Sequence, residues 1–327
     1  MIVIDAETVH DLMDWQLEVE ALRAGHRGGA SGARPAIDDL LMTDAGRALL
    51  IRASWVPANG GPGAVGLKAV TVFPGNPNRD KPLPAVQGQF LLFDGETGMV
   101  TASIDGAAIT AWKTAGDSAL GAALLARPDV GTLAMIGAGA MSEPLVRAHL
   151  AMRPSISRIV LGNRTRSRAE SLAERLSDTG RAVEIAGDID AAVAEGDVVS
   201  VATMSRDPII RGALLKPGAH LDLVGAYTPD MREADDEVFA RGRLFVDARE
   251  TTLHEIGELM IPLAAGVIKE TDIQGDLFDL VPAEGQDGGP GRRSAEEITV
   301  YKNGGGAHLD LMTAGAIYHA WQQRHRL

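Results

Sequence analysis

The segment from Thr132 to Ser142 is a glycine-rich turn that separates a short apolar run from a helical pattern. Gly137, Gly139 and Ser142 follow the spacing Gly-x-Gly-x-x-(Gly/Ala/Ser). The first glycine of such a turn permits a tight bend, the second lets the backbone approach a pyrophosphate, and the small third residue lets the helix pack on its strand. The turn therefore predicts a nucleotide-binding half that begins near residue 117, which leaves the upstream residues to supply a substrate site.

Strand and helix patterns alternate in the chain after Thr110. A helical segment over 119–127 stops before Pro128. Strand patterns follow at 132–136, 158–161, 182–185, 197–201, 219–224 and 243–247, with helical patterns at 140–151, 166–177 and 188–195. Alternation of this kind predicts a doubly wound parallel sheet.

The residues before Thr110 have a different pattern. Apolar side chains at helical spacing predict one amphipathic helix over residues 6–24, ended by the glycines of 25–32. Four β-prone runs follow, at 48–55, 64–73, 87–93 and 99–104, and glycine, proline, asparagine and aspartate separate them. With a hairpin signal at Asp94–Gly98, these runs predict a mostly antiparallel sheet. We expect the last helix, from about Leu309 to Arg324, to return to this part of the chain.

Charge and composition exclude several classes of function. The 327 residues include 31 basic and 44 acidic ones, a net charge of −13, and this disfavours a nucleic-acid partner. No apolar run approaches the roughly 18 residues of a membrane span, and the first residues lack the features of a targeting signal, so we expect a cytoplasmic protein. The chain has no cysteine, and His254-Glu255 lacks further ligands at metal spacing, so we expect no metal site.

The residues after the second predicted strand indicate which dinucleotide binds. At this position an acidic residue binds the ribose of NAD, whereas a basic residue accepts the 2′-phosphate of NADP. The chain reads Leu-Gly-Asn-Arg-Thr-Arg-Ser-Arg over 161–168, with three arginines and no carboxylate. Arg164 is suited to stacking on adenine or pairing with phosphate, and Asn163 and Thr165 offer neutral hydrogen bonds. We therefore expect NADPH as the preferred cofactor, with NAD as a possible one; the alternative is that the arginines form only a solvated helix start.

Three cations lie among residues that favour burial: Arg52, Lys68 and Lys113. A buried lysine or arginine is costly unless it meets an anion, so the three together suggest a pocket for a carboxylate. The alternative is that they lie on the solvent face of alternating strands.

The chain resembles the ornithine cyclodeaminase/mu-crystallin family, which includes alanine dehydrogenases and cyclic ketimine reductases. The segments that carry the resemblance extend over nearly the whole chain: Gly66-Leu-Lys68, Pro74-Gly-Asn76, Gly95-Glu-Thr-Gly98, Asp105-Gly106, Thr110-Ala-Trp-Lys-Thr-Ala115, Ile136-Gly-Ala-Gly139, Asn163-Arg-Thr165, Ala202-Thr203, Lys216-Pro-Gly-Ala-His220, Val224-Gly-Ala226, Arg232-Glu233 and the stretch from Gly304 to Asp310.

The resemblance implies an α/β fold of two domains. Residues 116–307 would form an NAD(P)-binding Rossmann-type domain with a doubly wound parallel sheet. Residues 1–115 and about 308–327 would form an α+β domain with a mostly antiparallel sheet, which binds the substrate and pairs to make a homodimer. The cofactor would contact Thr114, Gly137, Ala138, Gly139, Ala140, Met141, Asn163, Arg164, Thr165, Arg168, Thr203, Met204, Val224 and Gly225.

The resemblance also assigns roles to the three cations. Lys68 matches the active-site lysine of the family and Arg52 an arginine that binds the substrate carboxylate in some members. Lys113 stands where the family has a carboxylate-binding arginine, so a point charge replaces a bidentate fork. Arg34 is a further candidate for this carboxylate site, and the role of His308, near the nicotinamide in the family, stays open.

Tyr227 departs from the cyclodeaminase pattern. Ornithine cyclodeaminases and alanine dehydrogenases have an acidic catalytic residue here, and a tyrosine cannot be a carboxylate base at neutral pH. We therefore expect NADPH-dependent reduction of a cyclic ketimine acid such as Δ1-pyrroline-2-carboxylate, with Lys68 and Tyr227 catalytic and Arg52, Lys68 and Lys113 binding the substrate. Alternatives are an NAD-dependent ornithine cyclodeaminase, an amino-acid dehydrogenase and a non-catalytic protein that binds NADPH and a small ligand. The alternative role for Tyr227 is that it only fills the pocket.

Overall fold

The computed structural model describes residues 1–29, 34–57, 63–286 and 288–325. Contacts between residues divide the chain into two units, one formed by Met1–Lys113 with Gly306–Leu327 and the other by Thr114–Gly305. These divisions lie close to the predicted boundaries at residues 115 and 308. Each unit is built around one sheet.

The first unit contains a six-stranded sheet with the order β1-β6-β5-β4-β3-β2. Its strands are β1 (Ile2–Ile4), β2 (Ala36–Asp44), β3 (Arg47–Val56), β4 (Ala64–Val72), β5 (Val86–Asp94) and β6 (Val100–Asp105). Only β1 and β6 pair in parallel, so the prediction of a mostly antiparallel sheet is confirmed. β1 and β2 escaped the sequence analysis because each is an edge strand, and adjacent carboxylates at Asp38 and Asp39 interrupt the apolar pattern of β2.

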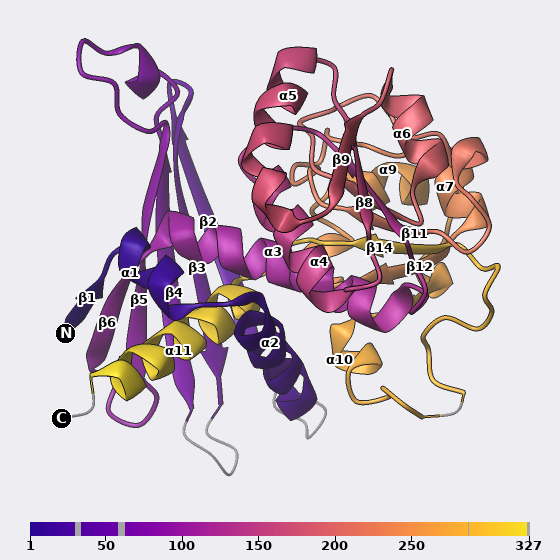
Figure 1. Ribbon diagram of the computed structural model, residues 1–327. Coiled ribbons are helices and arrows are strands. Elements are labelled where there is room, and N and C mark those ends of the chain that lie inside the picture. The colour runs from indigo at the N-terminus through magenta and orange to yellow at the C-terminus, as the bar shows by residue number, and fades with distance from the viewer. Residues whose placement is uncertain (30–33, 58–62, 287, 326–327) are drawn as a thin grey trace. The chain divides into compact units, whose positions relative to one another are not determined.

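Helices α1 (Ala6–Leu12), α2 (Trp15–Gly29) and α11 (Ala307–Arg324) belong to this unit, as does the start of α3 (Gly106–Leu125). The prediction of one helix over residues 6–24 is wrong, because Asp14 accepts a hydrogen bond from the Leu17 amide at 2.8 Å and begins a second helix there. α11 crosses β2 to β5, as Figure 1 shows. Side chains from α1, α3, α11 and the sheet form one core, with Phe90, Ile104, Ile109 and Leu311 among them.

The second unit contains an eight-stranded, all-parallel sheet with the order β13-β12-β14-β11-β10-β7-β8-β9. The strands are β7 (Thr132–Ile136), β8 (Arg158–Gly162), β9 (Ala182–Ile185), β10 (Val198–Val201), β11 (His220–Leu223), β12 (Arg243–Val246), β13 (Ile273–Gly275) and β14 (Thr299–Lys302). The prediction of a doubly wound parallel sheet is confirmed. The chain leaves β7 toward β8 on one side and resumes at β10 on the other, so the strand order reverses at β7 and β10, where such folds bind dinucleotides.

β14 lies between β12 and β11 in this sheet but was not predicted, because the charged pair Glu296-Glu297 precedes its short apolar run. The helices of the unit are the rest of α3, α4 (Ser142–Met152), α5 (Arg166–Arg175), α6 (Ile189–Glu195), α7 (Asp236–Arg241), α8 (Arg249–Thr252), α9 (Gly257–Ala264) and α10 (Leu277–Leu280). In the part of the chain described, no helix is long and apolar enough to cross a membrane.

Candidate functional site

The glycine turn after β7 has the geometry that a bound pyrophosphate requires. Gly137 has φ +108°, and a Cβ there would lie 2.5 Å from the carbonyl oxygen of Ala202. A Cβ on Gly139 would meet nothing within 4 Å, so the backbone at this position is open to an approaching group. Within the described residues, no side chain caps the start of α4, which leaves its first amides for an anion. Ala138, Ala140 and Met141 complete the turn and are half-buried or exposed.

Exposed arginines follow the neighbouring strand β8. Asn163 donates to the carbonyl oxygen of Thr165 at 2.7 Å, which shapes the turn before α5. Arg166 pairs with Glu170 at 3.1 Å. Among the described residues, neither Arg164 nor Arg168 forms an ion pair, and both are exposed. Two guanidinium groups beside the β8 end are thus available to a phosphate.

The other predicted cofactor contacts also lie in the second unit. Thr203 and Met204 follow β10, and Val224 and Gly225 follow the adjacent parallel strand β11. Met204 is 72% exposed. Thr114, on α3, accepts a hydrogen bond from Asn303 through its carbonyl oxygen. Tyr227, two residues beyond Gly225, is 61% exposed and so does not fill the core of this unit.

Lys68 belongs to a buried ion pair in the first unit. Its Nζ donates to Asp310 Oδ1 at 2.7 Å and to Thr110 Oγ1 at 3.3 Å, which joins β4 to α11 and α3. The side chain of Lys68 is 5% exposed and that of Asp310 is inaccessible. Arg52 lies opposite Lys68 in the register of β3 and β4 and pairs with Asp39 of β2 at 2.8 Å.

The electrostatics at Asp310 reveal what the three predicted cations do together. Burial alone would raise the pKa of its carboxyl, but the charges of Lys113, Lys68 and Arg52 outweigh burial and lower it. Lys113 is 3% exposed and lies on a helix, not in the strand context that the sequence suggested. The three cations therefore act on one buried position, where the local field favours a negative charge.

The sequence analysis missed Asp310 as a site residue; the only signal was its place in the family-like stretch from Gly304. His308, two residues before it, is buried, and burial together with the charges of His26 and Lys113 keeps its pKa well below the usual range. Its ring packs edge-on against His26, with 5.5 Å between centroids. Arg34 is exposed, and its charge also lowers the pKa values of both histidines.

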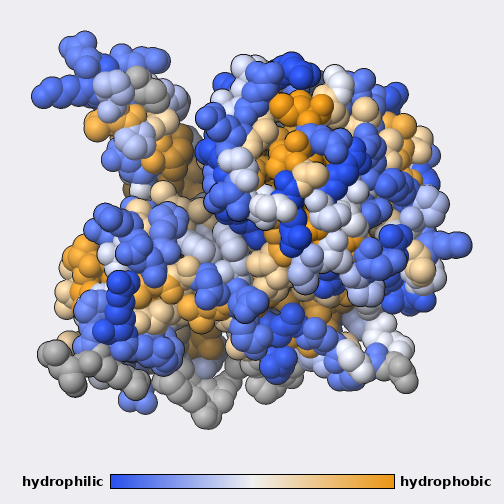
Figure 2. All heavy atoms as spheres, viewed as in Figure 1, coloured by the Kyte–Doolittle hydropathy of each residue, from blue (hydrophilic) through white to orange (hydrophobic). Residues whose placement is uncertain are grey.

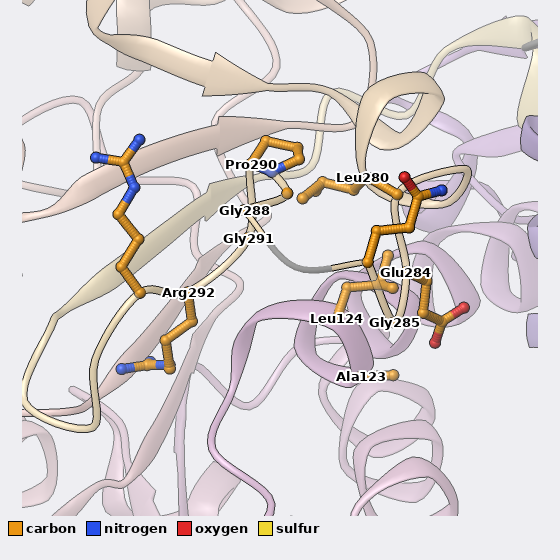
Figure 3. A pocket seen from close by; sticks show the side chains of 13 residues that line it. Ala123, Leu124, Leu280, Glu284, Gly285, Gly288, Pro290, Gly291 and Arg292 are labelled. Carbon is orange, nitrogen blue, oxygen red and sulfur yellow. The ribbon is translucent and has the colours of Figure 1, made fainter.

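A separate hollow in the second unit contains none of the predicted site residues. Residues of α3, of α10 and of the loop that contains Gly285 and Arg293 line this hollow. Figure 3 shows their side chains. Arg292 at its edge is held by backbone carbonyls, including that of Leu125 at 2.7 Å. No three His, Cys, Asp or Glu side chains in the described ranges are grouped as metal ligands would be.

Comparisons with known proteins bear on both units. A model of the ornithine cyclodeaminase/mu-crystallin family matches residues 43–325. The Delta(1)-pyrroline-2-carboxylate reductase of Paracoccus denitrificans is 46% identical over 93% of this chain and 92% of its own. The protein SAR DEFICIENT 4 of Arabidopsis thaliana is 40% identical over 84% of each chain. The solved structure of Thermococcus litoralis Delta(1)-pyrroline-2-carboxylate reductase with NADH and L-proline has a TM-score of 0.90 and 27% identity, and covers 99% of this chain and 98% of its own.

Proposed function

The chain belongs to the ornithine cyclodeaminase/mu-crystallin family, and we propose that it reduces Δ1-pyrroline-2-carboxylate, a cyclic ketimine acid, to proline with NADPH as the preferred donor. The protein is an NAD(P)-dependent imine reductase, an oxidoreductase that acts on CH–NH bonds. The buried ion pair of Lys68 with Asp310, 2.7 Å between Nζ and Oδ1, carries the proposal within the site, because the charges of Lys113 and Arg52 act on the same position.

The three cations have two roles in the proposed reaction. Arg52 and Lys113 hold the substrate carboxylate, which fixes the ring. Lys68 donates a proton from Nζ to the imine nitrogen, directly or through water, while Asp310 and Thr110 hold the lysine in place. Tyr227 is the second residue that we propose takes part in the proton transfer. When bound, the dihydronicotinamide supplies the hydride to the C=N carbon. One hydride and one proton convert the imine to the secondary amine.

The residues that follow β8 support the preference for NADPH. A ribose-binding carboxylate is absent from residues 161–168, and the guanidinium groups of Arg164 and Arg168 are exposed there without ion-pair partners in the described structure. A 2′-phosphate would pair with them bidentately. The relative from Thermococcus litoralis was solved with NADH. NADH and NADPH have the same nicotinamide, so only the adenosine end of the site can distinguish them.

The test is a panel of oxidation assays. We expect NADPH consumption with five- and six-membered cyclic imino acids, faster than with NADH, and proline as the product from Δ1-pyrroline-2-carboxylate. Release of ammonia from ornithine with NAD and no net change in cofactor would instead identify an ornithine cyclodeaminase. If no imine or amino acid were turned over while NADPH bound, the protein would be a binding protein.

A homodimer is the second part of the proposal, and the uncovered face of the first sheet supports it. Asp39, Arg52 and Lys68 are paired across β2, β3 and β4, so they share the face that α11 covers. Leu40 and Met42 alternate to the other face, where they are 52% and 48% exposed. Figure 2 shows hydrophobic side chains at the surface of this unit. Exposed apolar strand surface of this kind is typical of an interface.

The two faces of β2 provide the test. Replacing both Leu40 and Met42 with aspartate should convert a dimer to a monomer, because the charges would be buried in the interface; light scattering after size exclusion measures the mass. Leu41→Asp is the matched control, since Leu41 is 63% exposed on the same strand but points to the α11 side. If the double variant were still a dimer, the interface would not lie on this face of the sheet.

A further inference from the structure

Glu233 is a fully buried carboxylate that lies where β10 and β11 end. Its Oε1 accepts hydrogen bonds from the amide and the hydroxyl of Thr203, each at 2.7 Å. Its Oε2 accepts from the amide of Gly225 at 2.7 Å. One carboxylate thus ties together the residues that follow two adjacent strands of the parallel sheet.

The segments that Glu233 joins are closely packed. A Cβ at Gly225 would lie 2.0 Å from the Thr203 carbonyl oxygen and 2.5 Å from Glu233 Oε1. The amides of Thr203 and Gly225 donate to this carboxylate, and Thr203 follows β10 at the edge of the sheet where the strand order reverses. Dinucleotides bind at this edge in open parallel sheets.

Further residues fix Glu233 itself. Glu258 of α9 accepts hydrogen bonds from the amides of Glu233 and Ala234, at 2.7 and 2.9 Å. Lys302 of β14 is also buried, and donates to the carbonyl oxygens of Leu223 and Asn303. Burial and the charge of Glu258 raise the pKa of Glu233 to about 7, while Lys302 opposes that rise. The carboxyl therefore gains a proton as the pH falls below neutrality.

We propose that Glu233 is a positioning residue for the dinucleotide site, acting through Thr203 and Gly225 without touching the cofactor. The inference rests on the proposed function, because it presumes that NAD(P)H binds at this edge. No sequence pattern marks Glu233 as a chemical site, and it was selected only as part of the pair Arg232-Glu233 that resembles the family.

The three hydrogen bonds require a carboxylate and not merely a side chain of that size. A carboxylate offers acceptors on both oxygens, whereas glutamine has one acceptor oxygen and one amide that only donates. Glu233→Gln keeps the two bonds from Thr203 but sets an N–H against the Gly225 amide. A buried donor without an acceptor is costly, so the segment after β11 should shift.

The experiment measures the affinity of the purified protein for NADPH by isothermal titration. Glu233→Gln should raise the Kd by on the order of 10- to 100-fold, the cost of leaving one buried donor without an acceptor. The KM for NADPH should rise in parallel, with a smaller change in kcat. Hydrogen exchange without cofactor should be faster at the Gly225 amide. The wild-type Kd should increase as the pH falls through about 7, and the variant should lack this increase.

Asp197→Asn is the matched control. Asp197 Oδ2 likewise accepts two backbone amides, from Gly131 and Thr132 at 2.9 and 3.0 Å, but at the opposite end of the strands. It should lower stability and leave the Kd unchanged. Should Glu233→Gln fail to fold, Thr203→Val removes one of the three bonds and should raise the Kd less. A wild-type protein that did not bind NADPH would overturn the proposed function, whereas wild-type affinity in Glu233→Gln would overturn only the role of Glu233.

Discussion

Replacing Lys68 with methionine is expected to lower kcat for the reduction of Δ1-pyrroline-2-carboxylate by about 10²- to 10⁴-fold, the usual contribution of a positioned proton donor. Methionine has similar length and no charge, so it removes the hydrogen bonds to Asp310 and Thr110 together with the proton on Nζ. The rate is measured as NADPH oxidation at saturating imine. Binding of NADPH should stay unchanged, since Lys68 belongs to the first unit and the glycine turn to the second.

Lys68→Met must be compared with a double variant, because the single substitution leaves the Asp310 carboxylate buried without its cation. Removal of one member of a buried pair costs about 3–5 kcal/mol, enough to confuse lost catalysis with lost folding. Lys68→Met combined with Asp310→Asn removes both charges and should restore the melting temperature without restoring kcat. Lys81→Met, at an exposed loop position, should match the wild type in both measurements. If the folded double variant kept wild-type kcat, Lys68 would not be the proton donor.

The two halves of the chain were predictable to different degrees for a physical reason. The Rossmann-type unit is specified by local signals, because the bend at Gly137 and the alternation of strands and helices are properties of short segments. Strand β14 was missed because its place in the sheet depends on neighbours far away in the sequence. The break between α1 and α2 was missed because the cap at Asp14 lies within a continuous apolar period.

In the candidate site, too, contacts between residues far apart in the sequence could not be predicted. Lys68, Arg52 and Lys113 could be selected because cations among apolar residues need an anion, and a nearby carboxyl does feel all three charges. Their protein partners could not be identified in this way. Asp310 is 242 positions from Lys68 in sequence, and Asp39 lies on an edge strand that was not predicted. The choice of NADPH, by contrast, depended on one short segment and so can be tested by changing it.

Arg164→Asp is expected to reverse the preference between the two cofactors. The substitution removes a guanidinium that would bind the 2′-phosphate, and a charge-assisted hydrogen bond contributes about 1.5–3 kcal/mol, so the Kd for NADPH should rise on the order of 10- to 100-fold. The new carboxylate would stand where NAD-binding proteins hold the ribose hydroxyl, so the Kd for NADH should fall. Both constants are measured by titration.

Arg166→Asp is the control. Arg166 is also exposed but already pairs with Glu170 at 3.1 Å, so its loss should leave the ratio of the two constants near that of the wild type. Equal affinity of the wild-type protein for NADH and NADPH would contradict the role of the arginines, because a site that accepts a phosphate on Arg164 must distinguish cofactors that differ only by that phosphate.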